Sequence, residues 1–314
     1  MASPGRSHRK GISLLELAKK FPDNESAQAW FEKIHWPDGK ITCLRCESED
    51  VYRCKHKTMP FRCRTCKKYF SVKTGTAMQS SNVPLRKWVW AIYLEMTSLK
   101  GVSSMKLHRD IGVAQSNTWH VLHRLREGLM PEMLEVFEGP VEADETYIGG
   151  KEANKHEDKK LKAGRGTVGK TPVLGVKDRK TNKIKAKVIQ DTTKPTIQEF
   201  VNESRTEDSL VFTDDHTSYE GLTNHTSVNH SQKEWAVSTA LGELAHTNGI
   251  ESFWAVLKRA YHGTYHQISK KHLNRYVTQF AGKHNLRDED TEDQMAMVVL
   301  GMKGKRLKYK DLVA

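Results

Sequence analysis

VEADETYI, at residues 141–148, is the stretch that decides which fold the second half of this chain adopts. It is the first of three short segments of similar character, followed by PVLGVKD at 172–178 and KIKAKVIQ at 183–190. Segments of this length that are rich in valine and isoleucine and bounded by polar stretches are typical of β-strands. We therefore predict three consecutive strands in this region.

Helices and strands alternate after these three segments. Residues 195–204 show helical spacing of apolar side chains and begin with a proline, which is favoured in the first turn. SLVFTDD at 209–215 predicts a fourth strand and TSVNHS at 226–231 a weak fifth, and a helix begins near Asn248 with Thr247 as its N-cap. This order predicts a ribonuclease H-like α/β domain, in which a mixed sheet carries helices on its faces.

Three acidic residues lie where such a domain would collect metal-binding carboxylates. Asp144 is in the first strand, Asp214 ends the fourth, and Glu251 is in the first turns of the last helix. Three carboxylates brought together can hold two divalent metal ions about 4 Å apart, the arrangement that cuts or joins phosphodiester bonds. We predict two magnesium (or manganese) ions here, because these metals prefer a site made only of oxygen ligands.

Two neighbouring acids, Glu145 and Asp215, leave the assignment open. An acid pair at the end of a strand is often only a solvated turn or a helix cap. Strand alternation does not separate Asp144 from Glu145, because neither face of VEADETYI is cleanly apolar. On the last helix, Lys258 lies two turns after Glu251 and therefore on the same face, so that it and Arg259 can contact DNA phosphates.

Residues 84–127 predict three helices in close succession. The first runs from 85 to about 98, the second from an N-cap at Ser103 to Ile111, and the third from about 115 to 126, after a turn at Gly112. Two short helices joined by a glycine-containing turn fit a DNA-binding helix-turn-helix, although an ordinary three-helix packing unit is the alternative. In the helix-turn-helix the residues facing the major groove would be Gln115, Ser116, Asn117 and His120, and those reaching phosphates Arg124 and Arg126.

Four of the five cysteines form two CxxC pairs separated by 16 residues. The ligands would be Cys43, Cys46, Cys63 and Cys66, a set that fits tetrahedral coordination of a structural zinc ion in a zinc ribbon. Cys54 is left over as a free thiol. So small a module needs its metal to fold, so chelation should unfold residues 40–75.

The chain as a whole is therefore expected to be a multidomain α+β protein. Its expected segments are a helical lead-in at 1–38, a zinc ribbon at 39–75, a helix-turn-helix at 82–130, a ribonuclease H-like catalytic domain at 140–286 and a C-terminal tail at 287–314. The tail runs from an acidic cluster through an apolar stretch to the basic sequence GKRLKYK. It fits a packing helix followed by a DNA-contacting end as well as a solvated end.

Charge and composition favour a polyanionic partner. The formal net charge is +13 and the isoelectric point is near 9.4. Residues 1–140 contribute a net +9 of this charge, and residues 51–73 contain eight Lys and Arg and no acid. No apolar run is long enough for a membrane span, and the N-terminus has no signal-peptide pattern, so we expect a cytoplasmic, nucleoid-associated protein with no membrane partner.

Three blocks of the chain carry a specific resemblance. ADETYIGG at 143–150, TDDHTSY at 213–219 and HTNGIESFWAVLKRAYHGTYHQISKKHLNRYV at 246–277 are similar to the conserved blocks of bacterial insertion-sequence DDE transposases related to the Merlin transposons. The resemblance covers roughly residues 25–286. It implies an N-terminal zinc ribbon, a D-D-E triad of Asp144, Asp214 and Glu251, and Lys258 as a companion residue. Some relatives use an asparagine as the third ligand, which makes Asn248 the alternative to Glu251.

The resemblance implies a transposase that binds the terminal inverted repeats of its own element, cleaves them in a metal-dependent step and joins them to target DNA. Bringing two ends together implies a homodimer or higher oligomer on DNA. Two other functions stay open: a DNA-binding regulator whose sheet domain is a non-catalytic scaffold, and a metal-dependent nuclease that cuts without joining.

Overall fold

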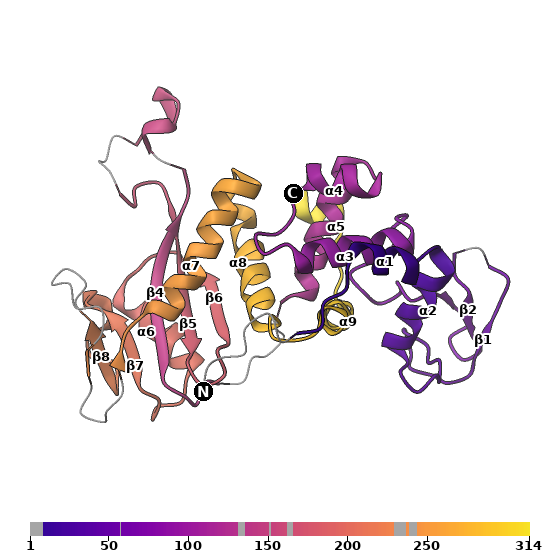
Figure 1. Ribbon diagram of the computed structural model, residues 1–314, viewed down its shortest axis with the longest axis horizontal. Coiled ribbons are helices and arrows are strands. Elements are labelled where there is room, and N and C mark those ends of the chain that lie inside the picture. Colours follow the sequence, from indigo (N-terminus) through magenta and orange to yellow (C-terminus); the bar gives the residue numbers. More distant parts are fainter. Residues whose placement is uncertain are drawn as a thin grey trace. The chain divides into compact units, whose positions relative to one another are not determined.

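A computed structural model describes residues 9–56, 58–130, 136–150, 152–161, 166–228, 237–238 and 244–314. The chain divides into two compact units (Figure 1). The first, here called the terminal unit, contains Met1–Glu132 and Leu286–Ala314, and the second, the central unit, contains Met133–Asn285. The lead-in, the ribbon, the helical segment and the tail, which the sequence presented as separate segments, all fall within the terminal unit.

The central unit is built on a five-stranded sheet with the order β6-β5-β4-β7-β8. The pairs β4–β5 and β5–β6 are antiparallel, whereas β4–β7 and β7–β8 are parallel, which confirms the predicted mixed sheet. The strands are β4 (Val141–Ile148), β5 (Thr171–Asp178), β6 (Ile184–Val188), β7 (Val211–Asp214) and β8 (His225–Val228). Residues 229–231 of the segment predicted as the fifth strand lie outside the described residues.

Helices pack on both faces of this sheet. On one face, α6 (Lys194–Ser204) packs its Ile197, Phe200 and Val201 against alternate residues of β4, β5 and β7. On the other face, α7 (Asn248–Ala260) and α8 (Lys270–Asn285) share an apolar cluster with Val173 and Ile184. The remaining elements of the unit are β9 (Val237–Ser238), β10 (Leu244–Ala245), three 3₁₀ turns at Glu152–Asn154, Glu157–Lys159 and Thr217–Tyr219, and a π turn at Tyr261–Tyr265.

Helix α7 approaches β5 closely at one glycine. A Cβ atom on Gly175 would lie 2.7 Å from the Trp254 indole ring, so the ring occupies the space that a side chain would take. Gly175 is also the register partner of Asp144 across the β4–β5 ladder. The absence of a side chain at this position therefore lets α7 lie against the sheet at the level of Asp144.

Helix α8 covers the edge strand β6 through two asparagine side chains. The Asn285 amide accepts from Ile184 N–H at 2.8 Å and donates to Ile184 C=O at 2.9 Å, and Asn274 Oδ1 accepts from Val188 N–H at 3.0 Å. Backbone groups at the edge of a sheet are otherwise free to pair with another chain. These contacts make α8 an integral part of the central unit.

The terminal unit is mainly helical and encloses one apolar cluster. Its helices are α1 (Leu14–Lys20), α2 (Asn24–His35), α3 (Leu85–Thr97), α4 (Ser104–Ile111), α5 (Gln115–Gly128), α9 (Thr291–Gly301) and α10 (Tyr309–Val313). A three-stranded ribbon, β1 (Val51–Arg53), β2 (Phe61–Cys63) and β3 (Tyr69–Phe70), packs its Phe61 and Phe70 against Trp36 at the end of α2. The lead-in helices therefore share a core with the ribbon.

Helix α9, in the C-terminal part of the chain, crosses α5 with almost no space between the two backbones. A Cβ on Gly128 would lie 2.8 Å from the Met302 side chain, and a Cβ on Gly301 would collide with the carbonyl of Gly128. Met295, Val298, Val299 and Met302 of the C-terminal segment are buried in the cluster that also contains Trp88 and Leu125. The first part of the tail is thus a packing helix, one of the two structures expected for it.

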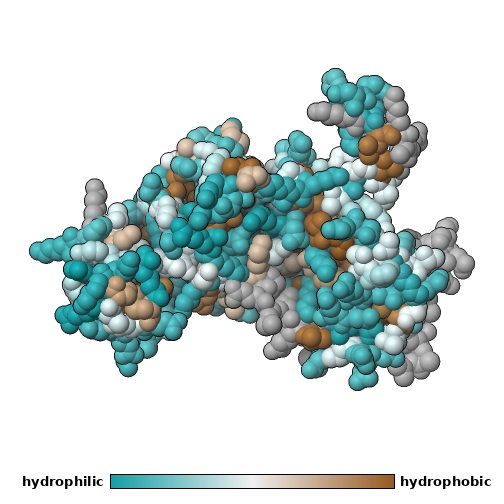
Figure 2. All heavy atoms as spheres, turned by 180° about the vertical axis from the view of Figure 1, so that it is seen from behind, coloured by the Kyte–Doolittle hydropathy of each residue, from teal (hydrophilic) through white to brown (hydrophobic). Residues whose placement is uncertain are grey.

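Among the described residues, no helix is both long enough and apolar enough to cross a membrane. Hydrophilic residues predominate on the face shown in Figure 2, and the hydrophobic residues there form small separate patches. Single exposed apolar side chains such as Leu15 and Leu161 are ordinary on a protein surface.

Replacing Gly175 by alanine should destabilise the central unit by about 1–3 kcal/mol, because the rigid Trp254 ring cannot yield without displacing α7. Urea denaturation of the full chain measures the loss, and hydrogen exchange of β5 and α7 peptides assigns it to this unit. Gly150→Ala is the matched control, since nothing lies within 4 Å of a Cβ there. Equal effects of the two changes would contradict the packing argument.

Candidate active site and metal centre

Asp144 on β4 and Asp214 on β7 lie at the same level of two neighbouring strands. The parallel β4–β7 ladder pairs Val141 with Val211 and Glu142 with Phe212. Both strands continue for two more residues, which brings the chain to Asp144 on β4 and Asp214 on β7. Because side chains alternate along a strand, Asp144 shares the face of Glu142, and Asp214 shares the face of Phe212.

A single arginine shows that these two faces are the same one. The Arg179 guanidinium donates to Glu142 and lies over the Phe212 ring, 4.1 Å from its centroid. Glu142 in turn accepts from the backbone N–H of Ile250 in α7. Asp144 and Asp214 therefore lie on the face of the sheet that α7 covers.

The neighbouring acid Glu145 lies on the opposite face. Its Oε2 accepts a hydrogen bond of 2.7 Å from the hydroxyl of Tyr219, a buried residue of the cluster formed with α6. The other neighbour, Asp215, follows the end of β7 and is exposed. The alternation that the sequence left unresolved is thus resolved by packing: Asp144 lies on the α7 face and Glu145 on the α6 face.

Negative charge is concentrated around Asp144. Burial, followed in size by the charges of Glu145, Asp214 and Glu251, raises the pKa of Asp144 to about 8. Burial also raises the pKa of Glu145, with Asp214 adding to the increase and the Tyr219 hydrogen bond opposing it. Carboxylates that destabilise one another in this way are stabilised by a nearby cation.

Glu251 lies in the first turn of α7. Its Oε1 accepts a hydrogen bond of 2.9 Å from the hydroxyl of Thr247, a buried residue at the N-cap position. The side chains of Asn248, Glu251 and Lys258 are all exposed, and their spacing of three and seven residues places them along one side of the helix. The alternative third ligand Asn248 is therefore one turn before Glu251 on the same side.

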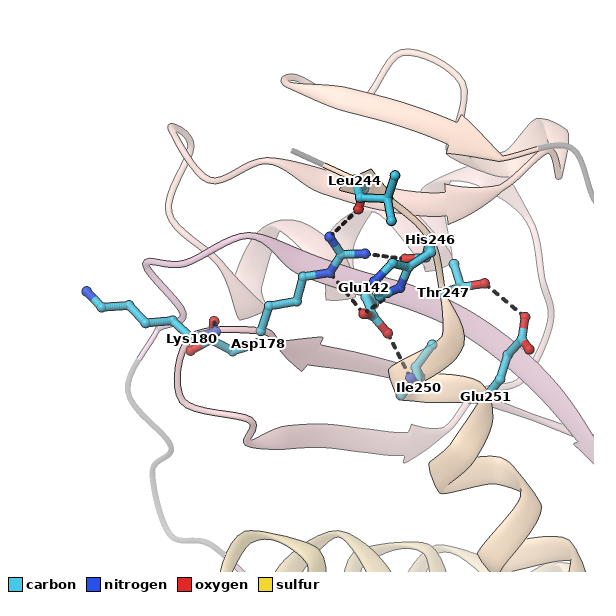
Figure 3. A network of polar contacts seen from close by, with 9 residues as sticks. Glu142, Asp178, Lys180, Leu244, His246, Thr247, Ile250 and Glu251 are labelled. Atoms are coloured by element: carbon cyan, nitrogen blue, oxygen red, sulfur yellow. Dashed lines mark hydrogen bonds and ion pairs between the residues drawn. The ribbon is translucent and has the colours of Figure 1, made fainter. Parts of the chain in front are cut away.

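Glu142 caps α7 from the sheet (Figure 3). The Thr247 side chain makes no capping hydrogen bond with a backbone N–H of the first turn, so the expected N-cap residue is in place but does not cap the helix. Instead, the Glu142 carboxylate accepts from the third backbone N–H of the helix, that of Ile250, at 2.8 Å. A carboxylate at this position satisfies an otherwise unpaired donor and interacts favourably with the helix dipole.

Arg179 ties the segment before α7 to the same carboxylate. Its Nε donates to Glu142 Oε1 at 2.9 Å, and its two terminal nitrogens donate to the carbonyls of Leu244 and His246 at 2.7 and 2.5 Å. The His246 ring lies 3.3 Å from the same Glu142 oxygen. Glu142 is 1% exposed, so this network positions α7 on the sheet from within the protein.

Sequence reasoning missed both Glu142 and Arg179. One available signal was a glutamate between Val141 and Ala143 at the start of a predicted strand, since a buried carboxylate requires partners. A second was Gly249 in the first turn of the helix, where a Cβ would lie 2.6 Å from Glu142 Oε2. The close approach of the Glu142 carboxylate to the helix explains why residue 249, in the first turn, is a glycine.

The four cysteines predicted as zinc ligands come together in the terminal unit. The Sγ atoms of Cys43, Cys46, Cys63 and Cys66 all lie within 4.8 Å of one another. Four thiolates at this separation fit tetrahedral zinc with no open position, which suits a structural metal. The fifth cysteine, Cys54, lies apart, and its Sγ is 3.5 Å from the carbonyl of Met59.

The predicted helical segment is present, with α4 and α5 joined at Gly112 in the left-handed conformation (φ 58°). Ser103 caps α4 as expected, accepting from Lys106 N–H at 3.2 Å. Gln115, Ser116 and Asn117 are exposed at the start of α5, and Gln115 also donates to Ser104 Oγ at 2.8 Å. Whether this pair of helices acts as a helix-turn-helix stays a prediction.

The expected phosphate contacts of Arg124 and Arg126 do not fit the structure. Their side chains are buried in the terminal unit, at 7% and 2% exposure. His120 is half-buried, and its Nε2 lies 3.1 Å from the carbonyl of Leu307 in the tail. The returning C-terminal segment covers His120 and Arg124, whose side chains both contact the carbonyl of Leu307.

Comparison with known proteins identifies the central unit. Residues 136–285 match the family model of the ISXO2-like transposase domain. The chain is also 26% identical over 272 residues to an uncharacterized protein in transposable element ISH50 of Halobacterium salinarum, with 83% of this chain and 91% of that protein covered. The resemblance to insertion-sequence transposases is thereby confirmed, while the relation to the Merlin transposons and a bacterial origin stay predictions.

Removal of one cysteine ligand should abolish zinc binding. We expect about one zinc ion per chain in the wild type, none in Cys63→Ser, and the wild-type amount in Cys54→Ser. The measurement is zinc released per chain on denaturation, with hydrogen exchange of residues 40–75 reporting whether the ribbon unfolds. Zinc retained by Cys63→Ser, or lost equally from Cys54→Ser, would overturn the ligand assignment.

Replacing Glu142 by glutamine should loosen the start of α7. The variant loses the charge that pairs with Arg179, and a hydrogen bond to a charged group contributes about 1.5–3 kcal/mol. Hydrogen exchange of the α7 amides should accelerate on the order of 10- to 100-fold. Glu203→Gln, which changes an exposed glutamate of α6, is the control and should leave exchange unchanged. Unaltered α7 exchange in Glu142→Gln would show that the network does not hold the helix.

Proposed function

We propose that this chain, which carries an ISXO2-like transposase domain over residues 136–285, is a transposase that acts on the ends of its own insertion sequence. In the proposed reaction it binds the terminal inverted repeats and cleaves them with a D-D-E triad of Asp144, Asp214 and Glu251. Water attacks phosphorus as the bond to the 3′ oxygen breaks, and the resulting 3′-hydroxyl then attacks target DNA in the same manner.

The observation that carries this proposal is the shared surface of the acids. Asp144 and Asp214 lie on the sheet face covered by α7, and the charges of Asp214 and Glu251 both act on the Asp144 carboxyl. Placing three mutually repelling carboxylates on one surface is costly unless they bind a cation. A mixed sheet with α7 across it also supports the ribonuclease H-like assignment.

The donor set fits magnesium or manganese. All three proposed ligands are carboxylates, and hard divalent cations prefer such oxygens. Bound between them, two such ions would polarise the attacking oxygen and stabilise the leaving one. The buried Glu142 network fixes α7, and with it Glu251, relative to the strand that bears Asp144.

Glu251 is proposed as the third ligand in preference to Asn248, because a carboxylate binds magnesium more strongly than a neutral amide. Both side chains are exposed on one side of α7, and Lys258 lies further along that side. Lys258, with the adjacent Arg259, is proposed to contact the DNA phosphates beside the metal site.

The terminal unit is proposed to bind the element ends. Exposed Gln115, Ser116 and Asn117 at the start of α5 would face the major groove as in a helix-turn-helix, and the basic ribbon would contact phosphates. Such a protein would work on chromosomal DNA in the cytoplasm, at the nucleoid. Joining two ends to one target calls for a homodimer or a higher oligomer on DNA.

The test is metal-dependent processing of labelled DNA that carries the element's own ends. Asp144→Asn, Asp214→Asn and Glu251→Gln should each reduce cleavage on the order of 100-fold or more, a loss typical of removing a group that stabilises developing charge. Binding of the ends without metal should be unchanged, because none of these residues belongs to the terminal unit.

Three variants serve as matched controls. Asp215→Asn and Glu145→Gln alter the neighbouring acids, and Asn248→Ala removes the alternative third ligand; Asp215→Asn should cleave like the wild type. Loss of cleavage in Asn248→Ala with full activity in Glu251→Gln would transfer the third position to Asn248. Cleavage without strand-transfer products would indicate a nuclease, and binding without any cleavage a DNA-binding regulator.

A further inference from the structure

A cleft of about 560 Å³ lies in the terminal unit, between three segments distant in sequence. Its walls are the loop at residues 79–84, the side of α5 that bears Asn117, His120 and Arg124, and the C-terminal segment at 306–309. The residues with polar or charged side chains that line it are Gln79, Ser80, Ser81, Asn82, Asn117, His120, Arg124, Arg306, Lys308 and Tyr309. No carboxylate occurs among the described residues of this lining.

The C-terminal wall is held firmly in place. Leu307 is buried, and its carbonyl accepts from Arg124 Nε at 3.3 Å and lies 3.1 Å from His120 Nε2. Just before it, the Lys305 ammonium donates to the carbonyls of Glu127 and Met130 at the end of α5. The side chains on either side of Leu307, those of Arg306 and Lys308, remain exposed.

The opposite wall is held by a buried lysine. Lys73 Nζ donates to the carbonyls of Ser81 at 3.0 Å and Val83 at 2.6 Å, which fixes the loop that borders the cleft. Burial, and to a lesser extent the charge of Arg124, lowers the pKa of Lys73 to about 8. A cation thus stands behind the loop as well as within the cleft.

Among the described residues that line the cleft, no acidic side chain neutralises the positive charge. Burial lowers the pKa of Arg124, and the nearby charge of Arg306 adds to the effect. Burial and then the Arg124 charge lower the pKa of His120 in the same direction. Arg124 is only 7% exposed, and a charge buried to this extent ordinarily has an anionic partner.

We infer that this cleft binds a backbone phosphate of duplex DNA, and that the C-terminal segment at residues 303–310 is part of the DNA-binding surface. The choice of duplex DNA rests on the proposed function. Asn117 lines the cleft and also belongs to the exposed start of α5, so a phosphate held here would adjoin a duplex whose bases face Gln115 and Ser116. Phosphate contacts of this kind set the register of a recognition helix without reading sequence themselves.

The buried Arg124 acts here as a structural and electrostatic element rather than an exposed contact. It fixes the tail through Leu307 and raises the positive potential of the cleft, while Arg306 and Lys308 are the side chains free to reach a phosphate. This arrangement explains how two basic segments, one in α5 and one at the chain's end, serve one surface.

The test measures binding of a fluorescent DNA duplex to the full-length chain across a range of salt concentrations, without divalent metal. Arg306→Gln and Lys308→Gln should each lower the slope of log affinity against log salt by about 0.9, the value for one phosphate contact, and should weaken binding several-fold. Lys310→Gln removes an exposed charge of the same segment that does not line the cleft, and should leave the slope unchanged.

Equal slopes for Arg306→Gln, Lys308→Gln and Lys310→Gln would overturn the inference. So would variants that lose affinity for a fluorescent RNA hairpin but retain it for duplex DNA. Unchanged thermal unfolding of the variants shows that the tail stays docked. Because no metal is present, the outcome is separate from catalysis: a wild type that binds duplex DNA through the cleft but never cleaves would refute only the proposed function.

Discussion

The carboxylate of Glu142 holds the first turn of α7 against β4, and the geometry of the acidic site depends on this contact. It combines a capping bond to Ile250 with an ion pair to Arg179, and Arg179 in turn fixes the segment that leads into the helix. Because Glu142 is buried, the bond is not weakened by water or salt as a surface ion pair would be. Gly175 and Gly249 allow the close approach that the contact requires.

Each of the two units carries a concentration of charge, negative in the central unit and positive in the terminal unit. In the central unit, burial and mutual repulsion raise the pKa of Asp144 and favour a cation. In the terminal unit, burial and repulsion among His120, Arg124 and Arg306 favour an anion. Titratable groups whose pKa values are shifted by burial and by like charges are typical of binding sites.

In the sequence, the central unit is inserted between the two segments that form the terminal unit. Helix α9, formed after the central unit, completes the core that α2, α3 and α5 begin. The crossing at Gly128 and Gly301 brings the final residues of the chain onto α5. Both ends of the sequence therefore contribute to one proposed DNA-binding surface, and neither end suffices to build its core.

The sequence by itself determined the elements and the local chemistry. Short segments rich in valine and isoleucine predicted the strands of the mixed sheet, and helical spacing of apolar residues predicted the helices. Cysteine spacing predicted the four-thiol cluster, and Ser103 and Gly112 predicted the limits of α4, because each of these depends on residues close in the chain. Only the tertiary structure decided which face of β4 each acid occupies, since the order and packing of the strands set that choice. It also decided that Glu142 caps α7 and that the tail covers Arg124, because both contacts join residues more than 100 positions apart whose pairing no local pattern encodes.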